Sequence, residues 1–254
     1  MPPLKQNYTY GQFSASPYAN KKTILVSWHS SEGRNRLLTA QPNDDFYILS
    51  NFFQPQIHPT YCGIASAVIV LNALFQPLNQ APTACHIQKI RNKKCVNLYL
   101  YAFLQTTFLG KKTDYIKEKE VIEFVKKTPS GEYQPGLSLD KLADLLHHYK
   151  AKVKTTFAKQ ENELKLFRST LLSTLAKQNH YIIIHFRCDY LGGLPSGHIS
   201  PICAYHQASD SVLVLDVAAH KTPWYWAPLK ELYQSMQESY GYQVQGGGYL
   251  QVTL

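Results

Sequence analysis

Cys62 stands where the chain changes from an extended segment to a long apolar run, and this position suits a nucleophile. The preceding segment, residues 54–60, contains two prolines that hold its backbone extended. The run that begins at Cys62, CGIASAVIVLNALF, is apolar around nearly its whole circumference and predicts a buried helix. A thiol at a helix N-terminus faces unpaired backbone N–H groups and the positive end of the helix dipole, which favour the reactive thiolate. The alternative is that Cys62 is a small hydrophobic residue of the core.

His198 and Asp216 are spaced so that they could complete a catalytic group with this thiol. His198 begins the strand-like stretch HISPICAY after a Leu-Pro-Ser-Gly turn, and Asp216 interrupts the apolar run 211–217. Residues 207–210 predict a short hairpin between these two strands, which brings the two side chains within reach of a cross-strand hydrogen bond. A carboxylate in an apolar strand needs such a donor. The prediction is a Cys62–His198–Asp216 triad, with a purely structural Asp216 as the alternative.

Gln56 is the candidate for stabilising the oxyanion in such a reaction. It precedes Cys62 by six residues, and its amide N–H could point at the carbonyl oxygen that Cys62 attacks. Together with the Cys62 backbone N–H it would form an oxyanion hole with two donors. Gln54 competes for this role, and a solvent-exposed loop glutamine is the alternative to both.

The other four cysteines carry no recognisable metal or redox motif, because the chain has no CxxC pair and no HExxH sequence. Side chains two residues apart share a strand face, so Cys203 points away from His198 and is expected to pack in the core. Cys188, at a strand end, is also expected to pack. Cys85 and Cys95 receive no assignment. The sequence therefore predicts no protein-bound metal and no tightly bound cofactor.

The elements that position these residues follow an α+β pattern, with helices in the first two thirds and an antiparallel sheet after them. Beyond the helix at 62–75, helices are expected at 114–128, 139–149 (capped by Ser138), 162–178 and 228–239. Strands are expected at 152–157, 181–187, 198–205, 211–217 and 249–254. Residues 1–254 are expected to form one catalytic domain that begins with an extended segment to about residue 36.

Composition excludes several other classes of protein. Of the 254 residues, 44% are hydrophobic and only 17% are charged, which excludes a disordered chain or a coiled coil. The formal net charge is +9, but the basic residues are dispersed and no nucleic-acid-binding motif is present. This charge could instead attract a small anionic substrate. No apolar run approaches the roughly 20 residues of a membrane span, and no signal peptide is visible, so the compartment stays open between cytoplasm and export.

Two stretches resemble the catalytic domain of phytochelatin synthases: QPQIHPTYCGIASAVIVLNAL, and SGHISPICAYHQASDSVLVLDVAAHKTPWYW. The resemblance implies a papain-like fold and a glutathione γ-glutamylcysteinyltransferase. Such an enzyme removes glycine from glutathione, holds γ-glutamylcysteine as a thioester, and passes it to water or to a second glutathione. The resemblance implies Cys62 as nucleophile, His198 as base and then acid, Asp216 as its orienting group, and Gln56 as oxyanion donor.

The chain departs from that family where the anionic substrate is usually bound. Ala219 stands where an arginine is expected, and residues 246–248 are glycines where the family tends to have an arginine. We therefore expect Arg187 to bind a substrate carboxylate, and Gly197 to leave room for substrate beside His198. The chain also ends without the Cys-rich segment of the plant members and resembles the short bacterial type, in which hydrolysis outruns chain extension.

A heavy-metal ion, cadmium or zinc, is expected to act as a glutathione thiolate complex, with glutathione as the partner. The sequence leaves open whether the protein forms a homodimer. Two alternatives stay open as well: a papain-like isopeptidase or deamidating effector acting on a protein, and a non-enzymatic module that binds metals or thiols. Glycine release from glutathione alone would distinguish the first alternative, and binding that survives replacement of Cys62 would indicate the second.

Overall fold

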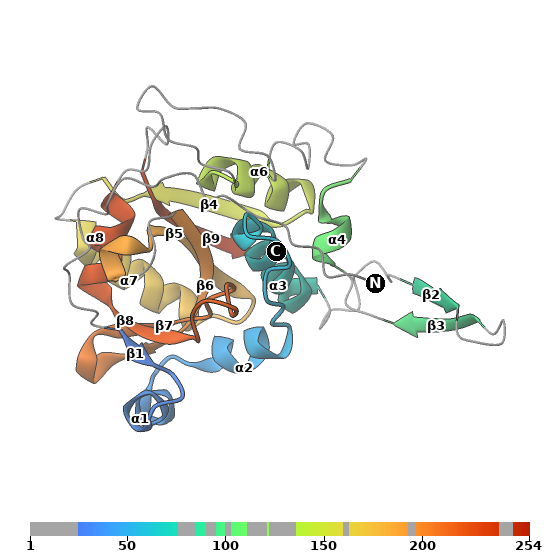
Figure 1. The fold of residues 1–254 in the computed structure, drawn as a ribbon. Helices are drawn as coiled ribbons and strands as arrows, with labels where there is room; N and C mark the ends of the chain where they lie inside the picture. The colour runs from blue at the N-terminus through green and yellow to red at the C-terminus, as the bar shows by residue number, and fades with distance from the viewer. Residues whose placement is uncertain are drawn as a thin grey trace, which may run out of the picture.

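A seven-stranded antiparallel sheet forms the centre of the computed structural model, with strand order β1-β8-β7-β6-β5-β9-β4 (Figure 1). The structure describes residues 25–75, 85–89, 95–99, 103–110, 121, 136–159, 163–192, 197–238 and 246–254, with the backbone alone at 85–89 and 95–99. The strands of this sheet are β1 Val26–Ser27, β4 Lys152–Phe157, β5 His180–Arg187, β6 Gly197–His206, β7 Ser211–Val214, β8 Tyr225–Pro228 and β9 Gly248–Thr253. A separate two-stranded sheet pairs β2 Cys85–Lys89 with β3 Cys95–Tyr99.

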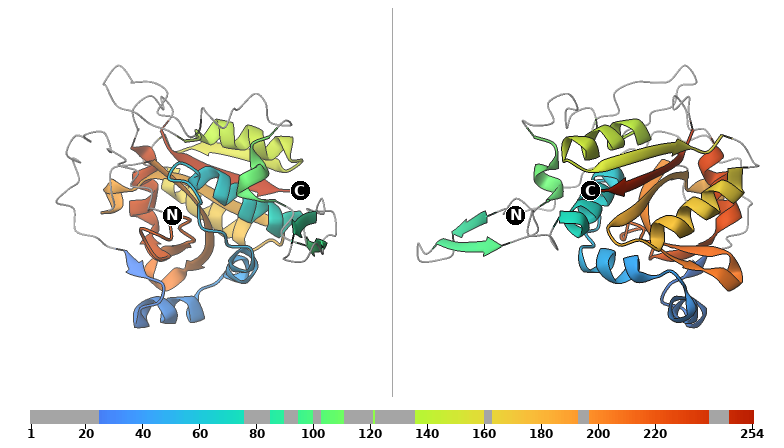
Figure 2. Two further views of the ribbon diagram at one scale, coloured as in Figure 1. Left: turned by 45° about the vertical axis from the view of Figure 1, so that its right-hand side comes forward. Right: turned by 180° about the vertical axis from the view of Figure 1, so that it is seen from behind.

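Helices cover both faces of the large sheet (Figure 2). The α-helices are α1 Ser31–Thr39, α2 Asp44–Asn51, α3 Cys62–Phe75, α4 Gln105–Phe108, α6 Leu139–His148, α7 Leu164–Leu175 and α8 Leu229–Gln237, with short 3-10 turns η4 Asp189–Leu191 and η5 Gln207–Ser209. Side chains of β5 alternate between the two faces. Tyr181 and Ile183 pack with α2, α3 and α6, whereas Ile182 and Ile184 pack with α7 and α8. Helices packed on an antiparallel sheet confirm the predicted α+β class.

The helix α3 is buried along almost its whole length. Every residue from Gly63 to Phe75 is buried, whereas Cys62 at its first position is partly exposed. This confirms the buried helix predicted from its continuous apolar composition. Burial of the body and exposure of the first residue place the thiol at the edge of the core.

Several other predicted elements are confirmed at nearly their predicted bounds. Ser138 caps α6 by accepting a hydrogen bond from the Lys141 N–H, and the leucines of α6 face the core. The strands β4, β5, β6 and β9 and the helix α8 lie within two residues of their predicted ends, whereas α7 ends three residues before its predicted end at residue 178. The helix predicted at 114–128 lies outside the described residues.

Other predictions require correction. The extended N-terminal segment ends earlier than about residue 36, because Ser30 caps α1 from Ser31 onward. The helix α2 was not predicted from the sequence; it opens with Asp44, whose acidic side chain suits the positive end of the helix dipole. The strand predicted to Val217 ends at Val214. Its continuation leaves the ladder because the Asp216 carboxylate accepts a hydrogen bond from the Ala218 N–H at 2.8 Å, forming a local turn.

Membrane insertion through a helix finds no support in this architecture. Among the described residues, no helix combines the length and the apolar composition that a bilayer crossing requires.

Candidate active site

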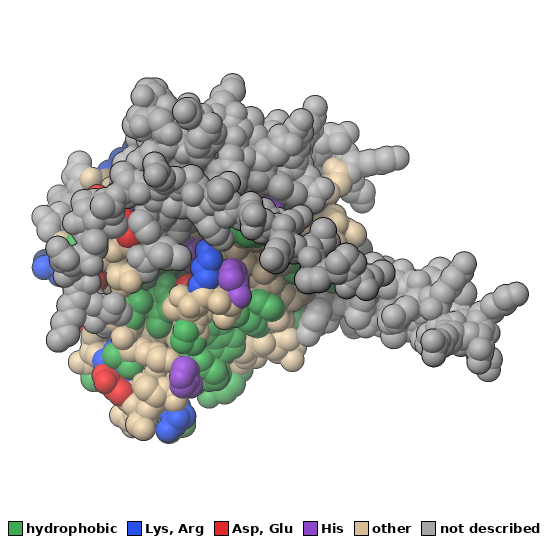
Figure 3. All heavy atoms as spheres, in the orientation of Figure 1, with side chains coloured by type: hydrophobic (Ala, Val, Ile, Leu, Met, Phe, Trp, Pro, Cys, Tyr) green, Lys and Arg blue, Asp and Glu red, His purple; other side chains and the backbone are tan. Residues whose placement is uncertain are grey.

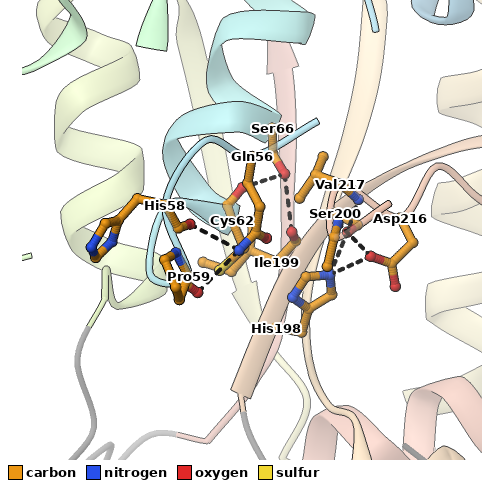
Figure 4. A network of polar contacts seen from close by, with 11 residues as sticks. Gln56, His58, Pro59, Cys62, Ser66, His198, Ile199, Ser200, Asp216 and Val217 are labelled. Carbon is orange, nitrogen blue, oxygen red and sulfur yellow. Dashed lines mark hydrogen bonds and ion pairs between the residues drawn. The ribbon is translucent and has the colours of Figure 1, made fainter. Parts of the chain in front are cut away.

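The thiol of Cys62 is fixed by the first turn of α3 and by a bridge to the sheet. The hydroxyl of Ser66 lies 2.8 Å from the Cys62 carbonyl oxygen and 3.1 Å from the Ile199 carbonyl oxygen. Ser66 is fully buried, so this hydroxyl has no competing water. Because Ile199 directly follows His198, the bridge holds the start of α3 against the strand that carries the His198 imidazole (Figure 4).

The predicted pair of His198 and Asp216 is in direct contact. His198 Nε2 lies 2.8 Å from Asp216 Oδ1, and both side chains are buried (Figure 4). The Ser200 hydroxyl lies 3.1 Å from the same nitrogen and accepts a hydrogen bond from the Val217 N–H at 3.4 Å. Asp216 and Ser200 therefore orient the imidazole from one side, and the other ring nitrogen remains for the thiol.

The electrostatics of this pair favour an imidazolium beside a carboxylate. Burial by itself lowers the pKa of His198, but the Asp216 charge, with the hydrogen bond that His198 donates to Asp216 and a hydrogen-bonding contact with Cys62, raises that pKa well above its ordinary value. Burial disfavours the Asp216 carboxylate, yet His198, the Ala218 N–H and the Tyr225 hydroxyl lower its pKa overall. The three predicted triad residues thus lie together as an interacting group.

The sequence reasoning did not predict that Tyr225, Cys188 and Ser66 support this group. The Tyr225 hydroxyl, on β8, donates to Asp216, and burial raises its pKa well above the ordinary value. Cys188 packs where predicted, but it also lies near enough to influence the pKa of both His198 and Tyr225. The signal for Ser66 was present, because it is one of only two polar side chains inside an otherwise apolar helix.

Gln56 lies beside the start of α3, as its spacing from Cys62 predicted (Figure 4). Its side chain is 8% exposed, and Nε2 donates to the His58 carbonyl at 2.9 Å and to the Pro59 carbonyl at 3.0 Å. Among the described residues, Oε1 is buried without a hydrogen-bond partner. Both amide protons are therefore engaged by the loop itself, so an oxyanion would have to attract one of them away from a carbonyl.

Gln54 offers a different arrangement. Within the described part of the chain, its Nε2 is buried and has no acceptor. A buried, unpaired donor is energetically costly, and such groups occur where a ligand supplies the missing partner. The choice between Gln56 and Gln54 as oxyanion donor therefore stays a matter for experiment.

With this geometry in place, comparison with known proteins becomes informative. A family model described as phytochelatin synthase matches residues 20–249. The chain belongs to the phytochelatin synthase family. It is 29% identical over 215 residues to glutathione gamma-glutamylcysteinyltransferase 1 of Lotus japonicus, covering 83% of this chain and 37% of that protein. It is 28% identical over 214 residues to glutathione gamma-glutamylcysteinyltransferase 1 of Arabidopsis thaliana, covering 83% of this chain and 38% of that protein.

A yeast relative matches over a shorter stretch. Glutathione gamma-glutamylcysteinyltransferase of Schizosaccharomyces pombe is 37% identical over 70 residues, which is 28% of this chain and 17% of that protein. The chain therefore spans well under half the length of these relatives.

Arg187, predicted to bind a substrate carboxylate in place of the arginine usual in phytochelatin synthases, lies at the end of β5. Its Nε and Nη2 lie 2.7 Å and 3.0 Å from the two carboxylate oxygens of buried Asp189, and Nη1 lies 4.0 Å from Glu238. A substrate carboxylate would have to share this guanidinium. Gly197, opposite Arg187 on β6, is exposed, and an added Cβ would lie 3.1 Å from His185 Nε2.

His185 is a second imidazole of this region that the sequence reasoning did not single out. It is buried on β5, and burial and the neighbouring His198 lower its pKa to about 4. Within the described residues its Nδ1 has no hydrogen-bond partner. A histidine in the otherwise apolar run YIIIHF could have been noticed as a signal.

An aromatic cluster joins the segment after Asp216 to the segment before Gln56. The ring of Trp224 lies 4.9 Å from Trp28 and 4.8 Å from Phe53. Figure 3 shows hydrophobic side chains interspersed with basic and histidine side chains on the face in view. Packing of these rings holds the segment before Gln56 against the segment after Asp216.

Proposed function

We propose that this chain is a papain-like acyltransferase and hydrolase that removes glycine from glutathione through a thioester on Cys62. The observation that carries the proposal is the contact of His198 with Asp216 at 2.8 Å, beside a thiol at the start of α3. Membership of the phytochelatin synthase family supplies glutathione as the substrate. Cys, His and Asp in this chain order and on these elements follow the papain-like arrangement of a nucleophile helix and an acid–base sheet.

In the first half of the reaction, the Cys62 thiolate attacks the carbonyl carbon between cysteine and glycine of glutathione. The resulting oxyanion collapses, the C–N bond breaks, and the His198 imidazolium gives its proton to the departing amine of glycine. Asp216 stabilises this imidazolium, consistent with the raised pKa of His198. The product is γ-glutamylcysteine bound to Cys62 as a thioester.

In the second half, neutral His198 takes a proton from an acceptor that attacks the thioester. Water as acceptor gives free γ-glutamylcysteine, and the α-amine of a second glutathione gives a chain longer by one γ-glutamylcysteine unit. The thiolate of Cys62 leaves, and the imidazolium is regenerated. Atoms and protons balance without an added redox partner or a protein-bound metal.

The oxyanion of each half reaction is stabilised by the Cys62 backbone N–H and by one side-chain amide. Gln56 is the first candidate because it lies beside Cys62, and it must redirect one N–H from a loop carbonyl. Gln54 is the second candidate because of its unpaired donor. Gln56→Ala and Gln54→Ala, compared for kcat, identify the donor, since losing one such contact costs about 10²–10³ in rate.

We further propose that water is the main acceptor. Ala219, exposed just beyond Asp216, provides no cation where an anionic acceptor would approach. Cadmium or zinc acts in this scheme as part of the acceptor, a glutathione thiolate complex. The two products should be quantified by chromatography at millimolar glutathione with and without Cd²⁺. Dominance of the chain-extended product without metal would contradict the preference for water.

Glycine release from glutathione in the absence of any protein substrate tests the proposal as a whole. Wild-type protein should release glycine, and Cys62→Ala should not, with an unchanged fold by circular dichroism. Equal release by both proteins would refute the assignment of Cys62.

A further inference from the structure

Gln105, the first residue of α4, reaches across to the loop that carries Gln56. Its side chain is 4% exposed. Oε1 accepts a hydrogen bond from the Ile57 N–H at 3.1 Å, and Nε2 donates to the Pro55 carbonyl at 2.9 Å. One side chain therefore binds the backbone on both sides of Gln56, although Gln105 lies 48 residues from Ile57 along the chain.

The backbone of Gln56 itself is held from the opposite side. Its N–H donates to the Val217 carbonyl at 2.9 Å, and Val217 directly follows Asp216. Three consecutive residues, 55–57, are thus bound by α4 on one side and by the segment after the catalytic acid on the other. Pro55 and Ile57 are exposed, so Gln56 has the one buried side chain of residues 55–57, and backbone hydrogen bonds hold the residues on either side of it.

The segment at α4 is a rigid base for this contact. Asn72 of α3, fully buried, donates to the Phe103 carbonyl at 3.0 Å and accepts from the Phe103 N–H at 3.0 Å. The Tyr149 hydroxyl donates to the Phe108 carbonyl at the other end of α4. Through Gln105, the loop is therefore held in place relative to α3, the helix that begins with Cys62.

We propose that Gln105 is a positioning residue that sets the place of the Gln56 amide relative to Cys62. The inference rests on the proposed function for its substrate, but its geometry involves only the protein. Acyl transfer is sensitive to such placement, because a displacement of about 1 Å can cost roughly 10²-fold in rate. Gln105 would thus act on the chemical step without touching the substrate.

The test compares Gln105→Met, which keeps the length of the side chain but loses both hydrogen bonds, with Gln251→Met as a matched control. Gln251 lies on β9, away from the loop, and donates to the Thr174 hydroxyl at 3.0 Å. Gln105→Met should lower kcat for glycine release about tenfold to a hundredfold with little change in KM. Alkylation of Cys62 by iodoacetamide, which forms no oxyanion, should stay within about twofold of the wild-type rate. Gln251→Met should change neither rate.

A double variant separates positioning from general structural support. If Gln105 acts through Gln56, Gln56→Ala combined with Gln105→Met should be no slower than Gln56→Ala alone. Three results would each overturn the inference: a double variant whose loss of kcat is the product of the two single losses, an alkylation rate of Gln105→Met that falls in parallel with kcat, or a wild-type kcat in Gln105→Met. Should Gln105→Met fail to fold, Gln105→Glu takes its place. It keeps the acceptor for Ile57 but faces the Pro55 carbonyl with an oxygen, and it should show the same loss of kcat.

Acylation by p-nitrophenyl acetate makes the result independent of glutathione. The ester is attacked by the same thiolate and passes through an oxyanion at the same place, so the burst rate of p-nitrophenol reports on acylation without glutathione. Absence of glycine release by wild-type protein would refute the proposed function and leave this burst as the test. A burst rate in Gln105→Met equal to that of wild type would then refute the role of Gln105.

Discussion

The bridge made by Ser66 gives a prediction whose size follows from the structure. Its buried hydroxyl lies 2.8 Å and 3.1 Å from the carbonyls of Cys62 and Ile199. Ser66→Ala removes this hydroxyl and leaves the Ile199 carbonyl without it in a site that excludes water. A buried polar group that loses its partner costs about 1–3 kcal/mol. For a domain of this size each kcal/mol lowers Tm by roughly 2–4 °C, so we expect a fall of about 2–12 °C.

The same change should reduce activity, because the bridge sets the thiol of Cys62 against His198. If about 1.4 kcal/mol of this loss appears in the transition state, the rate falls about tenfold. The rates of glycine release and of alkylation of Cys62 by iodoacetamide should both fall, since both need the thiol to lie beside the His198 imidazole. Thermal unfolding gives the change in stability of the same protein.

Thr174→Val provides the matched control. The Thr174 hydroxyl on α7 is also buried, donates to the Thr170 carbonyl at 2.7 Å and accepts from Gln251 at 3.0 Å, but it lies outside the site. It should lose similar stability and keep wild-type alkylation. If Ser66→Ala loses stability yet alkylates at the wild-type rate, the bridge does not position the thiol.

Three further predictions concern charge. Asp216→Asn removes the group that raises the pKa of His198, so the imidazolium should lose its proton at a lower pH than in wild type. The basic limb of the kcat/KM profile should therefore shift to lower pH, and an unshifted limb would contradict the coupling. Arg187→Ala should lower kcat/KM for glutathione about tenfold, through loss of a charge-assisted contact worth roughly 1.5–3 kcal/mol, whereas an unchanged value would leave Arg187 as the structural partner of Asp189. Burial raises the pKa of Asp45 from its ordinary 3.8 to about 8, so its ionisation disfavours the folded state progressively as pH rises from about 4 to 8. Asp45→Asn should therefore be more stable than wild type near pH 8 and lose this advantage near pH 4 in urea unfolding, and a difference that does not vary with pH would refute the assignment.

Local patterns were sufficient to predict the elements that carry the triad. The apolar run from Cys62 and the apolar residues of stretches 198–205 and 211–217 indicate buried elements, and burial acts on each segment separately. The contact of His198 with Asp216 followed from a short hairpin, whose length restricts the register. These predictions needed no knowledge of distant parts of the chain.

The remaining features depend on contacts between distant segments, which local patterns do not encode. Gln105 contacts Ile57 across 48 residues, and Tyr225 reaches Asp216 only because β8 pairs with β7. The engagement of both Gln56 amide protons by its own loop likewise depends on backbone geometry. Its proximity to Cys62 was predictable from spacing, but the direction of its donors was not.

The central claim is tested most directly by the intact mass of the protein, quenched with acid during turnover of glutathione. We expect an adduct with the mass of one γ-glutamylcysteinyl group on Cys62. The adduct should remain after a phosphine has reduced all disulfides, and it should be absent from Cys62→Ala. Glycine release that proceeds without this adduct in every quenched sample, or an adduct that persists in Cys62→Ala, would contradict the thioester mechanism.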